Sequence, residues 1–437
     1  MKQQNVVILG LGITGLSCVH YCLKQGILPV VIDTRAQPPG QDKLPDNVTL
    51  HAGEIPQSIL NQADLIVASP GIALASAALK EAAAAGVEII GDIELFARAV
   101  KAPVIAITGS NGKSTVTSLV GEMALQAGVK VGVGGNIGVP ALSLLEQDCD
   151  LYVLELSSFQ LETTHSLQPC IATVLNVTED HMDRYDSFDA YRQAKLTIYQ
   201  GAQQVLINRD DPLTFPEKTS AQLVSFGTDA ESDYGLRATE RGLGLTHCGE
   251  VLVYADELAL SGLHNIANVL AALALVDAAG VDRQAALRAA KTYTGLPHRC
   301  EFIKEVNGVR WINDSKATNV GATLAAIDGL APVIQGKLHL IAGGDGKGGD
   351  FSPLKEAFAQ QIASVVCFGQ DKHQIARLNS KCVVVNDLAE AVAYCAKIAE
   401  PADWVLLSPA CASLDMFTNY MARGDAFRAL VEELPCH

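Results

Sequence analysis

Long apolar runs, closely spaced cysteine pairs and an excess of positive charge are all missing from this sequence of 437 residues. No stretch approaches the ~20 consecutive apolar residues that a membrane-spanning helix needs, so no membrane span is expected. The net charge of −16 argues against nucleic acid or an anionic membrane surface as the main partner. None of the 11 cysteines forms a C-x-x-C pair, which argues against a zinc site or a thioredoxin-like motif, and we expect reduced, mostly buried thiols.

Charged residues are also scarce, at 18% of the chain, while hydrophobic residues make up 49%. This composition excludes a disordered chain and is typical of parallel sheets that are buried on both faces. Residues 1–18 carry a lysine before an apolar stretch, but glycines at turn spacing are out of place in a secretion signal. We therefore expect a cytoplasmic protein, and its length predicts about three domains.

Strands and helices alternate along the chain, which predicts an α/β fold of three domains. Residues 1–92 are predicted to form a small Rossmann-like domain. Residues 93–296 open with "APVIAITGSNGKST" and are predicted to form a central P-loop ATPase-like domain, with a β-rich excursion over 221–262. After the break "TGLPHR", residues 297–437 are predicted to form a third, open α/β domain of Rossmann-like type.

A glycine-rich turn, "GLGITGLSC", follows the first predicted strand. Gly10, Gly12 and Gly15 match the G-x-G-x-x-G spacing of a dinucleotide-binding turn, and Asp33 ends the next apolar run. The pattern indicates binding of NAD, but any parallel βαβ unit that holds a nucleotide diphosphate can use the same glycines. The turn alone leaves both alternatives open.

The stretch "TGSNGKSTV" carries the clearest signal for nucleotide chemistry. It lies between an apolar strand and a helix, where backbone N–H groups and a helix N-terminus bind anions. Lys113 is placed to contact the β- and γ-phosphates of ATP, and the hydroxyl of Ser114 or Thr115 to bind Mg²⁺. Gly109 and Gly112 frame a loop that does not meet the strict G-x-x-x-x-G-K-[ST] pattern. An ATP site here favours a second substrate, rather than a redox cofactor, at the first glycine turn.

Polar residues follow several other strands. Glu155 ends the buried run "LYVLE", where a carboxylate is costly unless it is paired or metal-bound. The loop "NVTEDHMDRY" contains Glu179, Asp180, His181 and Asp183, and taken alone it is equally typical of a solvated loop. Lys195 in "YRQAKLTIY" is, from its residues alone, more typical of a helix surface than of a catalytic group.

Three further polar groups follow strands of the third domain and are expected to meet in one crevice. They occur in "NDSKATN", "GGDGKG" and "SPACASLD", and comprise Asp314, Ser315, Lys316, Thr318, Asn319, Asp345, Lys347, Ser408, Ser413 and Asp415. Each group alone can be explained as turn chemistry, and the three together favour a site.

These blocks, with "GGNIG", "LELSSFQLE" and "GLPHR", resemble the Mur ligase family of ATP-dependent amide-forming enzymes in the same order and over the whole chain. The resemblance implies that the first domain binds a uridine diphosphate sugar. The "SSFQLE" block, the glycine turn and the short length resemble members that add D-glutamate to UDP-N-acetylmuramoyl-L-alanine, in the cytoplasmic synthesis of peptidoglycan precursors. The implied chemistry activates a carboxylate as an acyl phosphate, which the amine of D-glutamate attacks to give a tetrahedral intermediate.

The resemblance also implies roles for individual residues. Residues implied for the UDP-substrate are Thr14, Asp33, Thr34, Arg35, Ser69, Gly71 and Asn136. Residues implied for ATP are Gly109, Ser110, Asn111, Gly112, Lys113, Ser114, Thr115, Asn265, Asn268, Arg299, Asp314 and Lys316. Those implied for D-glutamate are Thr318, Lys347, Ser413 and Tyr420, the last in place of the phenylalanine of the family pattern. More than one Mg²⁺ is implied near Ser114, Thr115, Glu155, His181 and Lys195, with Lys195 carbamylated by CO₂, and the implied catalytic residues are Lys113, Glu155, His181 and Lys195.

Three alternatives remain at this point. A folylpolyglutamate synthase resembles the central and third domains but is not expected to begin with the "GLGITGL" domain. An NAD-dependent dehydrogenase would make the phosphate loop incidental, and a non-catalytic nucleotide-binding module leaves three polar strand ends unexplained. We expect a monomer that acts on small molecules, with no nucleic-acid partner.

Overall fold

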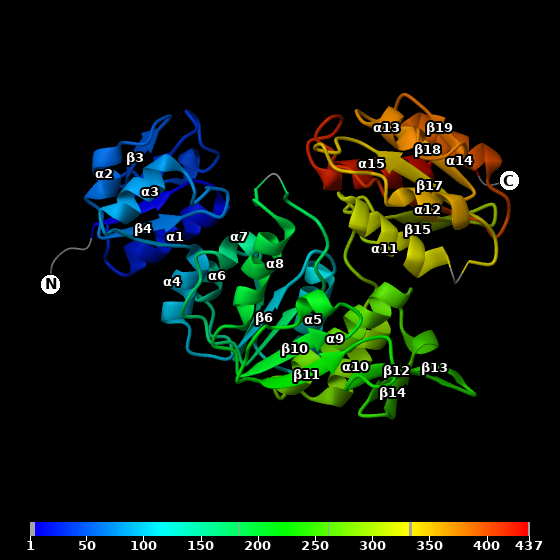
Figure 1. Cartoon of the computed structure of the whole chain (residues 1–437), viewed down its shortest axis with the longest axis horizontal. Helices are drawn as coiled ribbons and strands as arrows, with labels where there is room; N and C mark the ends of the chain where they lie inside the picture. The colour runs from blue at the N-terminus through cyan, green and yellow to red at the C-terminus, as the bar shows by residue number, and fades with distance from the viewer. Residues whose placement is uncertain (1–4, 183, 261, 332–333, 436–437) are drawn as a thin grey trace. The chain divides into compact units, whose positions relative to one another are not determined.

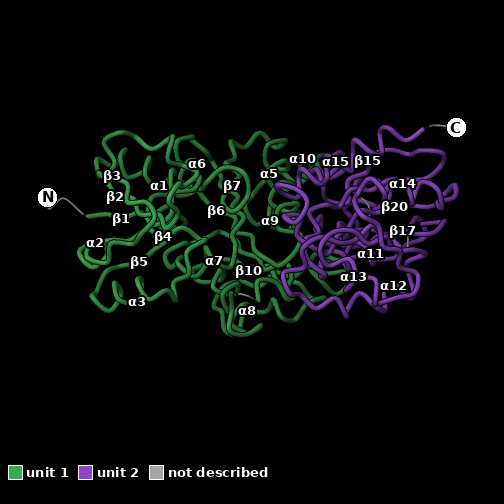
Figure 2. Tube along the Cα trace, turned by 90° about the horizontal axis from the view of Figure 1, so that it is seen from above, with its two compact units in different colours: residues 1–235, 271–289 green, residues 236–270, 290–437 purple. Residues whose placement is uncertain are grey.

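The computed structural model describes residues 5–182, 184–260, 262–331 and 334–435 (Figure 1). It confirms an α/β fold built on parallel-rich sheets. The chain divides into two compact units, one of Met1–Gly235 with Ala271–Ala289 and one of Leu236–Leu270 with Ala290–His437 (Figure 2). The predicted domain boundaries after residues 92 and 296 stay predictions, and Asp183 lies outside the described residues.

The first sheet has five parallel strands in the order β3-β2-β1-β4-β5. These strands are β1 (Val6–Leu9), β2 (Val30–Asp33), β3 (Thr49–Ala52), β4 (Leu65–Ala68) and β5 (Glu88–Ile90). The helices between them are α1 (Ile13–Lys24), α2 (Gln57–Asn61) and α3 (Ala77–Ala84). Strand order reverses beside β1, and in open α/β sheets ligands bind at the carboxyl ends of the strands next to such a point. The glycine turn after β1 lies there.

The first unit also contains a larger parallel sheet, in which β7, β8, β6, β9, β10 and β11 are neighbours in that order. These strands are β6 (Val104–Thr108), β7 (Val131–Gly135), β8 (Leu151–Glu155), β9 (Ile171–Val174), β10 (Gln204–Asn208) and β11 (Gln222–Phe226). The helices of this region are α4 (Asp92–Ala99), α5 (Lys113–Gln126), α6 (Ala141–Leu144), α7 (Ser158–Leu161) and α8 (Phe188–Leu196). The helices α9 (Leu263–Ala278) and α10 (Arg283–Thr292) each belong partly to the first unit and partly to the second. Short 3₁₀ helices occur at Gln41–Lys43, Thr197–Tyr199, Pro212–Thr214 and Ala255–Glu257.

The first two sheets share one apolar core, to which α4 contributes Phe96. The Phe96 ring packs edge-on against Tyr152 of β8, with ring centroids 5.3 Å apart. A carboxylate of α4 also joins this helix to the segment after α7. Glu94 accepts hydrogen bonds from the backbone N–H groups of His165 and Ser166 at 2.7 and 2.9 Å. The helix α4 therefore joins the first sheet to the second.

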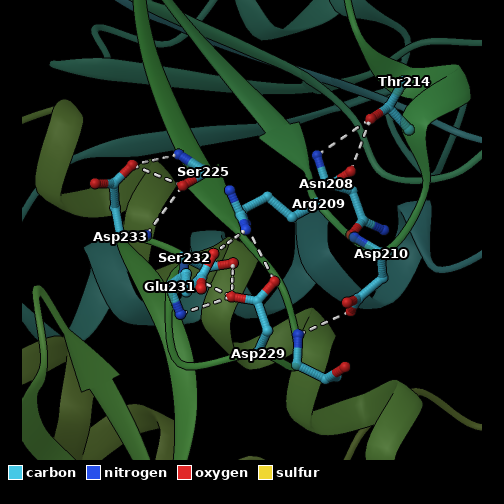
Figure 3. Close-up of polar contacts among 10 residues, drawn as sticks. Asn208, Arg209, Asp210, Thr214, Ser225, Asp229, Glu231, Ser232 and Asp233 are labelled. Atoms are coloured by element: carbon cyan, nitrogen blue, oxygen red, sulfur yellow. Dashed lines mark hydrogen bonds and ion pairs between the residues drawn. The ribbon is translucent and has the colours of Figure 1, made fainter.

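The β-rich excursion predicted over 221–262 contains β11, β12 (Tyr234–Thr239) and a hairpin of antiparallel strands, β13 (Gly242–His247) and β14 (Glu250–Tyr254). Figure 3 shows how the turn between β11 and β12 is held. Arg209 donates to Asp229 at 3.1 Å and to Glu231 at 3.0 Å, and Ser225 and Asp233 exchange hydrogen bonds across the turn. These acidic residues are satisfied by the chain itself, so we assign them a structural role.

The third sheet lies in the second unit, with strand order β15-β16-β20-β17-β18-β19. Only its β15–β16 pair is antiparallel. Its strands are β15 (Glu301–Val306), β16 (Val309–Asn313), β17 (Leu338–Gly343), β18 (Ser364–Phe368), β19 (Cys382–Val384) and β20 (Trp404–Leu407). The accompanying helices are α11 (Val320–Leu330), α12 (Leu354–Gln360), α13 (Lys372–Ala376), α14 (Leu388–Ile398) and α15 (Tyr420–Glu432).

Two expectations from composition can be compared with this fold. Among the described residues, no helix combines the length and the apolar character needed to cross a membrane. The ten described cysteines are free thiols, but only five of them are buried, so the expectation of mostly buried thiols is half met.

Candidate functional site

The glycine turn after β1 has the backbone that its spacing predicts. Gly10 has a φ of +98°, in the region that favours glycine, and Gly12 caps α1. A Cβ on Gly15 would clash with the carbonyl oxygen of Gly10, so this glycine allows α1 to pack closely on β1. The turn can therefore admit a phosphate group at the start of α1.

Asp33 ends β2 and is already engaged by its own chain. Its Oδ2 accepts from Leu11 N at 2.7 Å and from the Arg35 guanidinium at 2.6 Å, and its Oδ1 accepts from Arg35 N and Nε, both at 2.9 Å. The Arg35 hydrogen bonds lower the pKa of Asp33 to about 2. An acidic residue that recognises NAD must accept from ribose hydroxyls, and both oxygens of Asp33 are committed elsewhere. This arrangement disfavours the dehydrogenase alternative.

The other residues implied for the UDP-substrate surround this turn, apart from Asn136, which follows β7. Ser69 Oγ, at the end of β4, donates to Gly10 O at 3.2 Å, while Thr34 and Gly71 are exposed. Sequence reasoning missed Arg184, which precedes α8 and donates to Pro70 O at 3.4 Å and Ile72 O at 3.1 Å, on either side of Gly71. Its guanidinium also lies 4.4 Å from the centre of the Phe159 ring.

The phosphate loop leads from β6 into α5. Gly109 has a φ of +153°, and a Cβ there would come within 3.0 Å of Leu175. Gly112 adopts a left-handed conformation as the cap of α5, and Lys113 is the first residue of that helix. Ser114 and Thr115 follow it and are buried. The loop thus combines a helix N-terminus, a lysine and two hydroxyls, as predicted from the sequence.

The segment after β9 holds this loop in place. Asn111 N donates to Asn176 Oδ1 at 2.8 Å, and Asn176 Nδ2 returns a bond to Asn111 O at 3.1 Å. Ser110 Oγ donates to Thr178 O at 2.9 Å and lies 3.0 Å from the Tyr191 hydroxyl. Sequence reasoning missed Asn176, Thr178 and Tyr191. The only signal in the sequence was that Asn176 and Thr178 lie within four residues of the end of a buried strand.

Two lysines meet at the carbonyl of Gly109. Lys113 Nζ donates to Gly109 O at 2.7 Å and to Ser110 O at 2.9 Å, and Lys195 Nζ donates to Gly109 O at 2.9 Å. Lys195 is only 2% exposed and lies 4.6 Å from the centre of the Tyr191 ring. Burial, followed by repulsion from Lys113, holds the pKa of Lys195 well below its usual value. The alternative of a surface lysine is therefore wrong.

Glu155 ends β8 and is 2% exposed. Its Oε1 accepts from Asn136 Nδ2 at 2.8 Å, whereas no described residue donates to the buried Oε2. A buried carboxylate oxygen without a donor is costly for a protein alone and suits a cation. Glu155 and the hydroxyls that follow Lys113 therefore fit Mg²⁺, which is bound by one or two carboxylates together with substrate phosphates.

His181 was expected beside Glu155. Its ring lies 4.9 Å from that of Phe159, and its Nε2 is 3.7 Å from Asp180 Oδ2. Its side chain is 47% exposed. Within the described part of the chain, no three His, Cys, Asp or Glu side chains are grouped to hold a metal ion. A shared metal site of Glu155 and His181 stays a prediction.

The second unit carries the remaining residues implied for ATP. Asp314, after β16, is buried and accepts from Ser408 Oγ at 2.8 Å and from Cys300 N at 3.1 Å. Burial raises its pKa to about 7 despite these bonds. Arg299 lies beside Cys300 in the chain, and Lys316 Nζ lies 4.2 Å from the centre of the Tyr420 ring. Asn268 Nδ2 donates to Asn265 Oδ1 at 3.4 Å on α9.

Residues implied for D-glutamate lie on loops of the same unit. The loops after β17 and β20 pair through Asp345 and Ala412, whose backbone groups exchange hydrogen bonds of 3.0 and 2.8 Å. Lys347 is exposed on the first of these loops, and Ser413 follows Ala412 on the second. Thr318 lies in the turn before α11, and Tyr420 begins α15. Together with the hydrogen bond from Ser408 to Asp314, this pairing links all three polar strand-end groups of the third sheet.

Comparisons with known proteins agree with this architecture. Three family models match the chain in order: "Mur ligase MurD-like, N-terminal domain" over residues 4–91, "Mur ligase middle domain" over 107–276, and "Mur ligase, glutamate ligase domain" over 298–411. The N-terminal match covers the region that a folylpolyglutamate synthase was not expected to have. It therefore counts against that alternative.

Curated relatives match over almost the whole chain. Proteins called UDP-N-acetylmuramoylalanine--D-glutamate ligase from Escherichia coli K12 and from Yersinia pseudotuberculosis are each 56% identical over 436 residues, covering 99% of both chains. Solved structures show the same fold at low identity. The MurF ligase from Thermotoga maritima in complex with ADP has a TM-score of 0.64 and 16% identity, covering 99% of this chain and 96% of that one.

The UDP-N-acetylmuramate-alanine ligase MurC from Thermotoga maritima has a TM-score of 0.60 and 19% identity, covering 98% of this chain and 99% of that one. The family models and the full-length relatives indicate an ATP-dependent ligase. The structure agrees, because it has a phosphate loop with a lysine and, at the end of β8, a buried carboxylate oxygen without a donor among the described residues. The chain belongs to the Mur ligase family of ATP-dependent amide-forming enzymes.

Proposed function

We propose that this chain joins the amine of D-glutamate to the terminal carboxylate of UDP-N-acetylmuramoyl-L-alanine at the expense of ATP. The observation that carries the proposal is the 56% identity to named D-glutamate ligases over 99% of both chains. The reaction forms ADP, phosphate and a peptidoglycan precursor. We place it in the cytoplasm, in a monomeric enzyme with no nucleic-acid partner.

In the first step, a carboxylate oxygen of the UDP-substrate attacks the γ-phosphorus of ATP and ADP leaves. A carboxylate is a poor electrophile at neutral pH, and the acyl phosphate supplies a good leaving group. We assign to the phosphates Lys113, the backbone N–H groups of Gly109 and Gly112, and the loop residues Ser110 and Asn111, whose own backbone N–H groups donate to Asn176. The loop, the helix N-terminus and the lysine converge there. Their work is to position the phosphates and neutralise charge.

We further propose that more than one Mg²⁺ binds around this loop, where the ions would neutralise phosphate charge. We assign Glu155 through its unpartnered Oε2, a hydroxyl of Ser114 or Thr115, and His181 as the residues that hold these ions. Asn136 orients Glu155 through the bond to Oε1. Asn136 is also assigned to the sugar nucleotide, since it is exposed after β7.

We further propose that Lys195 reacts with CO₂. The ammonium ion first loses a proton, and the neutral amine then attacks the carbon of CO₂ and loses a second proton, which leaves a carbamate anion. Two observations support this: Lys195 is almost fully buried, and it shares the Gly109 carbonyl with the cationic Lys113. An anion at this position removes the repulsion between the two lysines and adds an oxygen ligand for Mg²⁺.

In the second step, the amine of D-glutamate attacks the acyl carbon, the resulting tetrahedral intermediate expels phosphate, and the amine loses a proton. We assign Thr318, Lys347, Ser413 and Tyr420 to D-glutamate, and Asn265, Asn268, Arg299, Asp314 and Lys316 to ATP. Thr14, Asp33, Thr34, Arg35, Ser69 and Gly71 are assigned to the uridine diphosphate. Asp33 acts there by fixing Arg35 and the turn, because both of its oxygens already accept hydrogen bonds from Arg35 or the chain.

An isotope experiment tests this function through its intermediate. UDP-N-acetylmuramoyl-L-alanine labelled with ¹⁸O in its carboxylate is incubated with ATP, Mg²⁺ and D-glutamate, and the released phosphate is analysed by mass spectrometry. We expect one labelled oxygen in each phosphate, because a carboxylate oxygen leaves with the phosphoryl group. Product formation with unlabelled phosphate would contradict the acyl-phosphate route.

A further inference from the structure

The guanidinium of Arg423 is completely buried in the second unit, and none of the roles assigned above explains a buried charge there. Arg423 belongs to the first turn of α15 and has no exposed surface. Burial lowers the pKa of its guanidinium to about 10, so the side chain is still a cation at neutral pH. A charge this deeply buried is costly, and replacing such groups by apolar side chains often leaves a fold equally stable. Stability alone therefore does not explain it.

The hydrogen bonds of the Arg423 side chain go to uncharged oxygens on two different loops. Its Nε donates to Ser315 Oγ at 2.9 Å, and one terminal nitrogen donates to Ser315 O at 2.8 Å and to Cys411 O at 3.1 Å. The other terminal nitrogen donates to Ala412 O at 3.2 Å. One planar fork thus spans the turn after β16 and the loop after β20. A lysine, with its donors on a single nitrogen, cannot reproduce that span.

These contacts link Arg423 to every loop that carries a residue assigned to D-glutamate. Ser315 lies three residues before Thr318, and its hydroxyl donates to Tyr420 O at 2.8 Å. Ala412 precedes Ser413 and pairs with Asp345, whose Oδ1 accepts from Lys347 N at 2.9 Å. Close packing supports the same junction, because a Cβ on Gly344 would come within 3.2 Å of the guanidinium.

We propose that Arg423 is a positioning residue for the amino-acid substrate, which it serves by holding three loops in register from beneath. This rests on the assignment of D-glutamate to those loops in the proposed function. Arg423 cannot touch the substrate, since it has no exposed surface. Its charge also raises the electrostatic potential under a site that must accept a dicarboxylate, and charges are poorly screened in a buried environment. The specific consequence is weaker binding of D-glutamate when the fork is lost.

The test measures KM for each of the three substrates in the full-length enzyme, by phosphate release, for Arg423→Lys and Arg423→Met. We expect the KM for D-glutamate to rise about 10- to 100-fold, the range typical of small misplacements in a site. The KM for ATP should rise by a smaller factor, because Ser315 lies between Asp314 and Lys316, and the KM for UDP-N-acetylmuramoyl-L-alanine should stay unchanged. The lysine variant keeps the charge and should bind D-glutamate better than the methionine variant.

Phe427→Leu is the matched control. Phe427 lies one turn further along α15, is fully buried and packs against Trp311 of β16, with ring centroids 6.1 Å apart. It should lower the thermal unfolding midpoint and leave the KM for D-glutamate unchanged. The proposal is overturned if the arginine variants raise all three KM values by the same factor, if they leave the KM for D-glutamate unchanged, or if neither variant folds. Wild-type enzyme without D-glutamate-dependent turnover would instead refute the proposed function.

Discussion

Glu155 offers a sharp test, because the structure predicts opposite effects of one substitution on stability and on activity. In Glu155→Gln the oxygen that accepts from Asn136 is kept, and the unpartnered carboxylate oxygen is replaced by a neutral amide nitrogen. Leaving a buried polar atom unsatisfied costs about 1–3 kcal/mol, and more when the group is charged. Burial lowers the pKa of the neighbouring Lys195, which weakens the attraction that is lost with the Glu155 charge.

We therefore expect the free energy of unfolding of Glu155→Gln, without nucleotide or Mg²⁺, to equal that of the wild type or exceed it by up to about 2 kcal/mol. Activity should fall in the same variant. Loss of a metal ligand that stabilises phosphoryl transfer is worth several kcal/mol, and each 1.4 kcal/mol is about tenfold, so kcat/KM should drop by at least about 100-fold.

Urea denaturation and phosphate release measure the two effects separately, and ligand protection joins them. At 100 times its Kd, a Mg²⁺-nucleotide analogue adds about 2.7 kcal/mol to the stability of the wild type. Each tenfold loss of affinity removes about 1.4 kcal/mol of that gain in the variant at the same concentration. A variant that is destabilised by more than about 2 kcal/mol yet keeps most of its activity would refute the reasoning, since the unpartnered oxygen would then be structural.

Four further predictions follow from the same site. Lys195→Arg should be nearly as inactive as Lys195→Ala in the phosphate-release assay, because arginine keeps a cation but cannot form the carbamate, and substantial activity in Lys195→Arg would reject the carbamate. The activity of the wild type should fall when CO₂ is stripped at mildly acidic pH and return when bicarbonate is added. Lys113→Ala should lower kcat far more than it lowers the thermal midpoint, and a normally folded variant with most of its activity would contradict the assigned contact to phosphate. For Asp314 the folded-state pKa of about 7 lies above the ordinary value of 3.8, so the stability of the wild type falls as pH rises between these values. Relative to the wild type, Asp314→Asn should therefore gain up to about 4 kcal/mol of unfolding free energy from pH 4 to pH 8 in urea titrations, and a stability difference that does not change with pH would refute the raised pKa. Calorimetry should show tighter binding of UDP-N-acetylmuramoyl-L-alanine than of NAD, and the reverse order would contradict the proposal that the first glycine turn binds a uridine diphosphate.

The sequence predicted most of the fold because its local signals agree with the tertiary structure. Runs such as Val6–Leu9 and Leu65–Ala68 are buried along their whole length, as expected for parallel strands covered on both faces. The phosphate loop was predictable for a similar reason, since glycine, lysine and hydroxyl residues occur together within a few positions. Each of these features needs only neighbouring residues.

Contacts between distant segments could not be predicted in this way. Asn176 lies 65 residues from Asn111, and Arg423 lies 108 residues from Ser315. Nothing in the local sequence distinguishes these polar side chains from others on loops and helices. Lys195 shows the same limit, because its helix, Phe188–Leu196, contains mostly polar residues that suggest a surface, and only the tertiary packing buries its amine.

The most direct test of the central claim is phosphate release from ATP with purified enzyme and Mg²⁺, in reactions that each omit one substrate. The account predicts sustained release only when UDP-N-acetylmuramoyl-L-alanine and D-glutamate are both present, with one phosphate per amide bond formed. Equal release without D-glutamate, or sustained turnover with another amino acid and none with D-glutamate, would contradict it.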